Sequence, residues 1–272
     1  LRMKNGFYIG LKEIKTKFKD KPNEINISTG HFEMANRSVK LNNFKIIIGK
    51  SDVELNGELP GFINYLTDQN APLVIEASLK SGNLILEDVI YGSESKGESQ
   101  KISIPSNLNF KLAASIDKLS FSKFEAANIK GDIVIANQKI LLSDLSLNTM
   151  DGRALLNASA DASGENIRIK AVSDLSGINI SKLFYQCNNF GQNTLNEKHL
   201  NGFATATLNF SGDWNRELTA DLNSITATGN LSVEQGRLVD FKPLLSLSKY
   251  IEVNELRDIK FQTLQSHFDI AN

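Results

Sequence analysis

Hydrophobic and polar residues alternate one by one along much of the chain. In residues 109–116, Phe110, Leu112 and Ile116 fall on one side of an extended strand, and polar residues fall on the other. Residues 204–210 show the same two-residue period. This alternation is typical of an antiparallel sheet with one face buried and the other in water. The pattern therefore predicts an all-β, mainly antiparallel fold.

Turn residues punctuate this pattern at short intervals. The dipeptides that favour a hairpin turn, because both positions tolerate positive φ, are Asn5-Gly6, Asn56-Gly57, Asp151-Gly152 and Asn201-Gly202. Residues 92–100 contain no apolar side chain and predict a loop. The sequence therefore predicts short strands joined by tight turns.

Helical periodicity is scarce. The best candidate is residues 241–251, with Asp240 as the N-cap and Pro243 in the first turn. Residues 178–186 predict a second short helix, and residues 62–66 predict a single turn. These few short helices are the only ones that we expect.

The chain repeats itself. Residues 30–44 align without a gap on residues 131–145, and the register continues to Leu55 with Leu156 and to Asn56 with Asn157. The repeat predicts units of strand, turn and strand near 30–60 and 131–160. A looser copy covers 229–241, with Gln235-Gly236 as its turn, and the motif starts again at His267. We therefore expect residues 1–272 to form one continuous repeat-built segment of a longer chain.

Charge and composition remove several classes of function. The 30 basic and 31 acidic residues give a net charge of −1, which argues against nucleic acid as a partner. The single cysteine, Cys187, excludes an internal disulfide framework and any zinc site made of several cysteines. The three histidines lack metal-ligand spacing, and no apolar run is long enough to span a bilayer. We expect neither a metal nor a cofactor.

The motif search also argues against an enzyme. Residues 92–97 resemble the start of a phosphate-binding loop, but Glu98 stands where that loop needs lysine. Neither a nucleophile elbow nor a dinucleotide-binding glycine motif is present. We therefore predict no catalytic residues.

An apolar sheet face with too few helices to cover it must be closed by curling, by a partner or by an apolar ligand. A twisted sheet that curls into a hydrophobic groove suits acyl chains, because burial contributes about 0.8 kcal/mol per methylene. The candidate groove-lining residues are Phe44, Ile46, Leu112, Ile116, Leu145, Leu147, Leu208 and Phe210. Plain core packing, as in a β-sandwich, explains the same residues equally well. Trp214 is a candidate hairpin cap, with a ligand or membrane contact as the alternative.

Several segments together resemble the AsmA family in its Bacteroidetes form. They are residues 178–184, 189–192, 199–202, 231–248 and 256–272, about the last third of the chain. Repeated units of the pattern Gly-x-Ile-x-Ile-Ala-Asn extend a weaker likeness over most of the remainder. The likeness depends on the combination of these segments, because each one alone is degenerate.

The resemblance implies a periplasmic protein held at the inner membrane by an N-terminal helix outside this segment. It further implies kinship with bridge-like lipid transfer proteins that have a repeating β-groove, and a role in lipid transport and outer-membrane biogenesis. The partners would be phospholipid or another acyl-chain lipid, the membrane, and possible envelope proteins. Two alternatives stay open: a scaffolding module for envelope assembly whose apolar face binds protein, and a glycan-binding surface protein.

Overall fold

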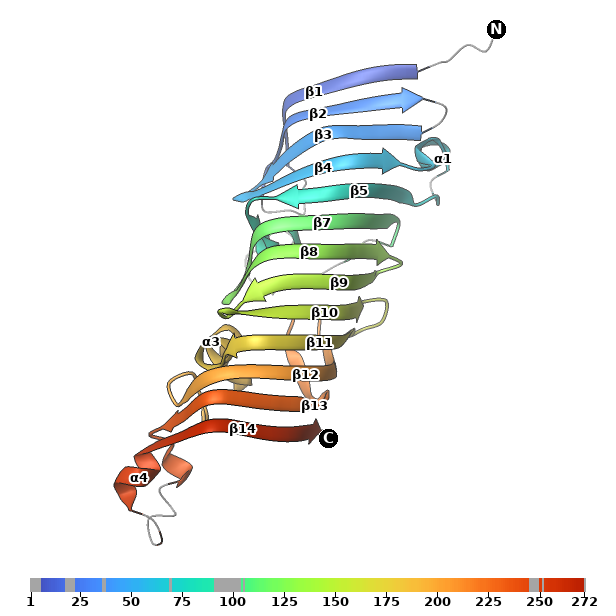
Figure 1. The fold of residues 1–272 in the computed structure, drawn as a ribbon. Coiled ribbons are helices and arrows are strands. Elements are labelled where there is room, and N and C mark those ends of the chain that lie inside the picture. Colours follow the sequence, from blue (N-terminus) through green and yellow to red (C-terminus); the bar gives the residue numbers. More distant parts are fainter. Residues whose placement is uncertain are drawn as a thin grey trace.

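The computed structural model describes residues 6–17, 23–35, 38–68, 70–90, 104, 106–244, 250 and 252–271. In this part of the chain, the strands form one 14-stranded sheet that is open and curled (Figure 1). The predicted all-β, mainly antiparallel class with a few short helices is confirmed.

The first half of the sheet is built from the N-terminal residues. Its strands are β1 (Gly6–Thr16), β2 (Ile25–Ala35), β3 (Ser38–Ile48), β4 (Ser51–Leu59), β5 (Leu73–Ser81) and the short β6 (Leu84–Ile85). The second half contains β7 (Leu108–Phe121), β8 (Phe124–Ala136), β9 (Lys139–Thr149), β10 (Gly152–Asp161), β11 (Ile167–Asn179), β12 (Leu200–Trp214), β13 (Ala220–Val239) and β14 (Asp258–Ile270). Within β1–β5 and within β7–β14, strands adjacent in sequence are adjacent in the sheet, whereas β6 pairs with β7 and not with β5.

The two halves meet at a parallel pair. Strand β7 pairs in parallel with β5 and, further along, with β6, whereas the other strand pairs of the described sheet are antiparallel. A parallel pair needs a crossover connection, and residues 82–107 supply it. The sheet is therefore two antiparallel ladders joined side by side (Figure 1).

The strands bend because bulges interrupt them; the bulges of β3 and β9 lie at the same level, next to Phe44 and Leu145, and the bulge of β13 lies further along the strands, beyond Val233. Asn43, Asp144 and Gln235 have φ values of 52°, 50° and 51°, in the left-handed region. At each of these positions two residues of one strand lie opposite a single residue of the next. Bulges of this kind bend a strand and increase its twist. These bulges therefore contribute to the curl of the sheet.

Two of these bulges are stabilised in the same way, at positions 101 residues apart. The backbone N–H of Asn43 donates to Oδ1 of Asn56 on β4 at 2.7 Å. The backbone N–H of Asp144 donates to Oδ1 of Asn157 on β10 at 2.9 Å. An asparagine on the neighbouring strand thus satisfies the N–H that the bulge removes from the ladder.

A glycine beneath a large apolar side chain also recurs 101 residues further along the chain, at Gly30 and Gly131. A Cβ atom added at Gly30 would lie 3.0 Å from the ring of Phe44. A Cβ atom added at Gly131 would lie 2.8 Å from the Cα atom of Leu145. The missing side chain lets each apolar residue close over the neighbouring strand.

The expected turns are partly wrong. Asp151-Gly152 lies at the turn from β9 to β10, as expected. Asn56-Gly57 and Asn201-Gly202 instead lie inside β4 and β12, and Gln235-Gly236 lies inside β13. Residues that tolerate positive φ serve bulges as well as turns, and a glycine inside a strand permits close approach of the next backbone. Asn5 lies outside the described residues.

Two of the expected helices are confirmed. They are α1 (Phe62–Thr67) and α3 (Ile180–Gln186), where the side chain of Asn179 caps α3 by accepting from the N–H of Lys182 at 3.2 Å. Helix α2 (Leu86–Ile90) and helix α4 (Val253–Arg257) were not expected from the sequence.

The expected helix over 241–251 is not observed in its described part. Residues 242–244 form a single 3-10 turn, and residues 245–249 and 251 lie outside the described residues. The expected loop over 92–100 also lies outside them.

Candidate functional site: the apolar face of the sheet

One face of the sheet, which we call the apolar face, carries an unbroken row of apolar residues. Residues directly opposite each other on paired strands place their side chains on the same face. Followed from strand to strand, one row contains Ile9, Phe32, Leu41, Gly57, Ala77, Leu112, Ile133, Leu142, Ala158, Ala171, Phe210, Ala227 and Ile270. No polar side chain interrupts this row between the two edges of the sheet. Twelve steps of about 4.8 Å make it about 58 Å long.

The candidate lining residues all fall on this face, in three neighbouring rows. Leu112 and Phe210 belong to the row described above. Phe44, Leu145 and Leu208 lie in a second row, where Leu145 faces Leu156 and Leu208 faces Gly229. Ile46, Ile116 and Leu147 lie in a third row, opposite Val53, Ile129 and Ala154. The sheet thus places all eight side chains on one surface.

These eight residues differ in how accessible they are. Five of them, Phe44, Leu112, Ile116, Leu145 and Leu147, are only 3–8% exposed. Ile46, Leu208 and Phe210 are half-buried. The first five therefore contribute to packing whatever else they do, and the half-buried residues are the ones that a ligand can reach.

Short helices and turns cover one side of the apolar face, along an edge that we call the helical rim. The rim contains α2, α3 and the turns at Lys50, Lys123 and Asp151. Helix α2 is tied to it because Oε1 of Glu87 accepts from the N–H of Ser122. Helix α3 packs Leu183 and Phe184, and its C-cap Cys187, against a buried cluster that contains Ile178 and Ala204 of the apolar face. Away from this rim, none of the helices in the described part of the chain packs against the apolar face of β11–β13 (Figure 1).

Trp214 lies on the uncovered part of the apolar face. It is the last residue of β12 and lies opposite Ile167, which shares a face with Ala171. Its ring centroid is 5.8 Å from that of Phe210. Trp214 is half-buried, so it ends a strand at a hairpin and contacts the apolar face at the same time.

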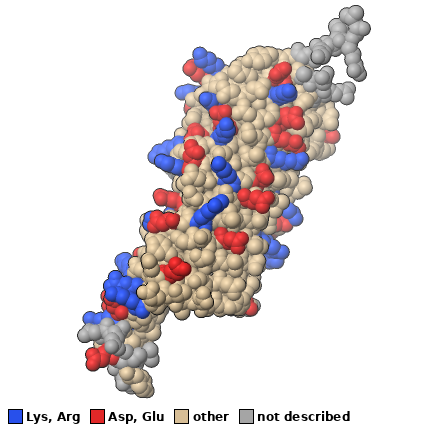
Figure 2. Space-filling model, viewed as in Figure 1, with Lys and Arg blue, Asp and Glu red and all other residues tan. Residues whose placement is uncertain are grey.

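The opposite face of the sheet is polar. It carries cross-strand ion pairs, such as Lys111 of β7 with Glu76 of β5 at 2.6 Å and Arg168 of β11 with Asp213 of β12 at 2.5 Å. Over the lower strands, Figure 2 shows a nearly charge-free area. An open depression of about 850 Å³ there is lined by a mixture of hydroxyl, amide, charged and apolar side chains that includes Thr207, Asn230, Arg153, Asp174 and Leu155. This depression offers hydrogen bonds but little enclosure, so we regard the apolar face as the better candidate site.

Electrostatics adds little chemistry to the site. A hydrogen bond from Lys182 lowers the pKa of Asp151, and the pair anchors α3 to the turn after β9. Burial raises the pKa of the Cys187 thiol, which makes it a poor nucleophile. Among the described residues, no group of His, Cys, Asp and Glu side chains is placed to hold a metal ion. In the same part of the chain, no helix has the length and apolar character needed to span a membrane.

Comparison with known proteins identifies no relative: no family model, curated protein or solved structure matches the chain significantly.

Alternation in the sequence indicates which side of each strand is apolar, but not how the strands align. The edge-to-edge row depends on bulges that keep Leu142 and Leu145 of β9 on the same face. The left-handed residue between them, Asp144, is the local signal for that bulge. The covering role of α2 has no comparable signal in the sequence.

Proposed function

We propose that this chain is a lipid-binding groove of the AsmA type, which holds phospholipid acyl chains against its apolar face. The observation that carries the proposal is the apolar row that runs from β1 to β14 without a polar interruption. A row of about 58 Å exceeds the hydrocarbon thickness of one leaflet, about 15 Å, several times. Such a length suits movement of a lipid along the face better than storage of one molecule.

In this proposal the protein supports lipid transport between the inner and outer membranes and hence outer-membrane biogenesis. It acts in the periplasm, held at the inner membrane by an anchor outside residues 1–272. The binding free energy comes from burial of methylene groups, about 0.8 kcal/mol each, so no catalytic step is assigned to the chain. The alternative is a scaffolding role in which the same face binds protein instead of lipid, and the experiment must distinguish this role from lipid binding.

The single tryptophan provides the test. Trp214 lies on the apolar face next to Phe210, so a bound acyl chain carrying bromine should quench its fluorescence. We expect saturable quenching by a brominated fatty acid, and phospholipid that co-purifies with the protein in native mass spectrometry. Absence of both in the wild-type chain would contradict lipid binding and favour the scaffold.

A matched pair of variants locates the site. Leu208→Asp puts a charge on the apolar face, and Thr207→Asp puts the same charge one residue away on the polar face. We expect Leu208→Asp to abolish quenching and Thr207→Asp to retain it, with both folded by circular dichroism. If Leu208→Asp fails to fold, Leu208→Ser replaces it, with weaker quenching as the expected result. Equal quenching in folded Leu208 variants and in Thr207→Asp would contradict the proposed site.

A further inference from the structure

The helical rim contains a left-handed helical turn immediately after α3. Asn188, Asn189, Phe190 and Gly191 have φ values of 50°, 52°, 54° and 71°. Left-handed backbone brings Cβ close to the following carbonyl oxygen; asparagine tolerates this best and bulky residues tolerate it poorly. A phenylalanine inside such a turn is unusual, and strain that persists needs surroundings that enforce it.

Side-chain hydrogen bonds enforce this turn. Oδ1 of Asn188 accepts from Nζ of Lys123 at 2.9 Å, and Oδ1 of Asn189 accepts from the N–H of Glu197 at 3.0 Å. Phe190 is 52% exposed, and its ring meets the ring of Phe184 in a T-shaped arrangement at a centroid distance of 5.1 Å. The strain therefore holds an aromatic ring in the solvent next to the covered edge of the apolar face.

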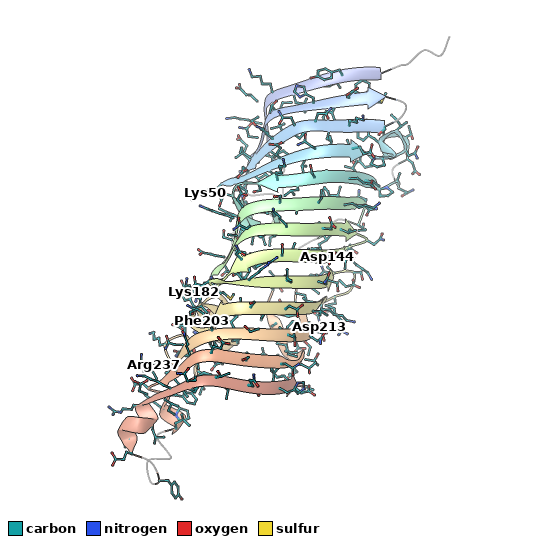
Figure 3. The ribbon with its side chains drawn as sticks, viewed as in Figure 1. Lys50, Asp144, Lys182, Phe203, Asp213 and Arg237 are labelled. Atoms are coloured by element: carbon teal, nitrogen blue, oxygen red, sulfur yellow. The ribbon has the colours of Figure 1, made fainter. Side chains whose placement is uncertain are left out.

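A second aromatic residue and a cation complete a small surface, which we call the rim patch: Lys123, Tyr185 and Phe190. Tyr185 is also 52% exposed, and Nζ of Lys123 lies 5.2 Å from the centre of its ring. Figure 3 shows Lys50, Lys182 and Arg237 along this side of the molecule. Lys182 is paired with Asp151 and Arg237 with Asp258, so Lys123 is the cation that the rim patch itself supplies. Aromatic rings beside lysine are typical of surfaces that contact phospholipid headgroups, where the rings enter the interface and lysine meets phosphate.

The rim patch is joined to the proposed groove. Phe190 contacts Phe184, and Phe184 and Leu183 pack against a buried cluster that contains Ile178 and Ala204 of the apolar face. Apolar side chains therefore lead from the exposed rings to the interior of the curl. A lipid that leaves a bilayer at the patch would meet apolar surface at each step.

We infer that the rim patch docks on the surface of a phospholipid bilayer, with Tyr185 and Phe190 in the interface and Lys123 toward headgroup phosphate. The inference rests in part on the proposed function, because it names the surface that would supply the lipid. Docking itself is a separate property and is tested separately.

The test is flotation of the 272-residue chain with vesicles of phosphatidylcholine that contain a minority of phosphatidylglycerol. We expect the wild-type chain to float with the vesicles, and Phe190→Ser and Tyr185→Ser each to lower its partition coefficient about tenfold, equivalent to about 1.4 kcal/mol. Tyr185→Ser leaves the left-handed turn intact, so it keeps the test independent of that turn. Leu66→Ser is the matched control, because Leu66 is 62% exposed on α1.

Two results would overturn the inference: no flotation of the wild-type chain, or flotation that survives both aromatic substitutions. Quenching of Trp214 by brominated fatty acid without vesicles reports on the groove alone, and we expect the rim variants to retain it. If the wild-type chain floats but Trp214 is not quenched, the proposed function fails while the docking inference stands.

Discussion

The curl of the sheet depends on bulges, and the hydrogen bond from Asp144 to Asn157 allows that dependence to be measured. Asn157→Ala removes the acceptor for the N–H of Asp144 at 2.9 Å. Both residues are exposed, so water replaces part of the interaction, and the net cost should be about 1 kcal/mol. Asp144→Gly should act in the opposite direction, because glycine adopts the φ of 50° without strain, and it should add about 0.5 kcal/mol.

Urea denaturation followed by circular dichroism measures both changes as shifts in midpoint at constant slope. The repeat provides an internal replicate, since Asn56→Ala removes the equivalent acceptor for Asn43 at 2.7 Å. We expect the two alanine variants to lose similar stability. If Asn157→Ala has no effect, the hydrogen bond from Asp144 to Asn157 does not stabilise the bulge. If Asp144→Gly is as destabilising as Asn157→Ala, the left-handed backbone of Asp144 is not a source of strain.

Three further predictions concern packing and pH. Gly131→Ala should cost more than about 2 kcal/mol in denaturant unfolding, because its Cβ would lie 2.8 Å from a backbone Cα atom. Leu147→Ala should lower the free energy of unfolding by about 2–5 kcal/mol because Leu147 is buried. Leu208→Ala should lower it clearly less because Leu208 is half-buried. Equal losses would contradict the division of the eight residues into packing residues and accessible residues. A hydrogen bond from Lys182 lowers the pKa of Asp151 below 3.8, so that pair stabilises the fold above pH 3.8 and loses its contribution as the pH falls through the lowered value. Lys182→Met should therefore lose less stability than the wild-type chain between neutral and acidic pH, and an identical acid profile would contradict the pairing.

The sequence predicts the fold class better than the site. Alternation in segments such as 109–116 predicted which side of a strand is apolar, and the sheet follows it because a two-residue period has only one way to bury that side. Dipeptides such as Asn201-Gly202 were wrongly predicted to form turns, because residues that tolerate positive φ are needed at bulges inside strands as well as at turns. The rim patch was beyond prediction, since exposure of Phe190 depends on hydrogen bonds to Lys123 and Glu197 in other parts of the chain.

The parallel join between β5 and β7 has a consequence for how the molecule assembles. On either side of it, each strand pairs with its neighbour in sequence, and such local contacts form quickly once the chain is available. The join must instead wait for the connection of residues 82–107 to close, which carries a loop-closure entropy. Each ladder can therefore form its local strand pairs before the seam closes, and closure of the seam then packs Val53 and Leu79 of one ladder against the buried residues Ile116 and Ile129 of the other.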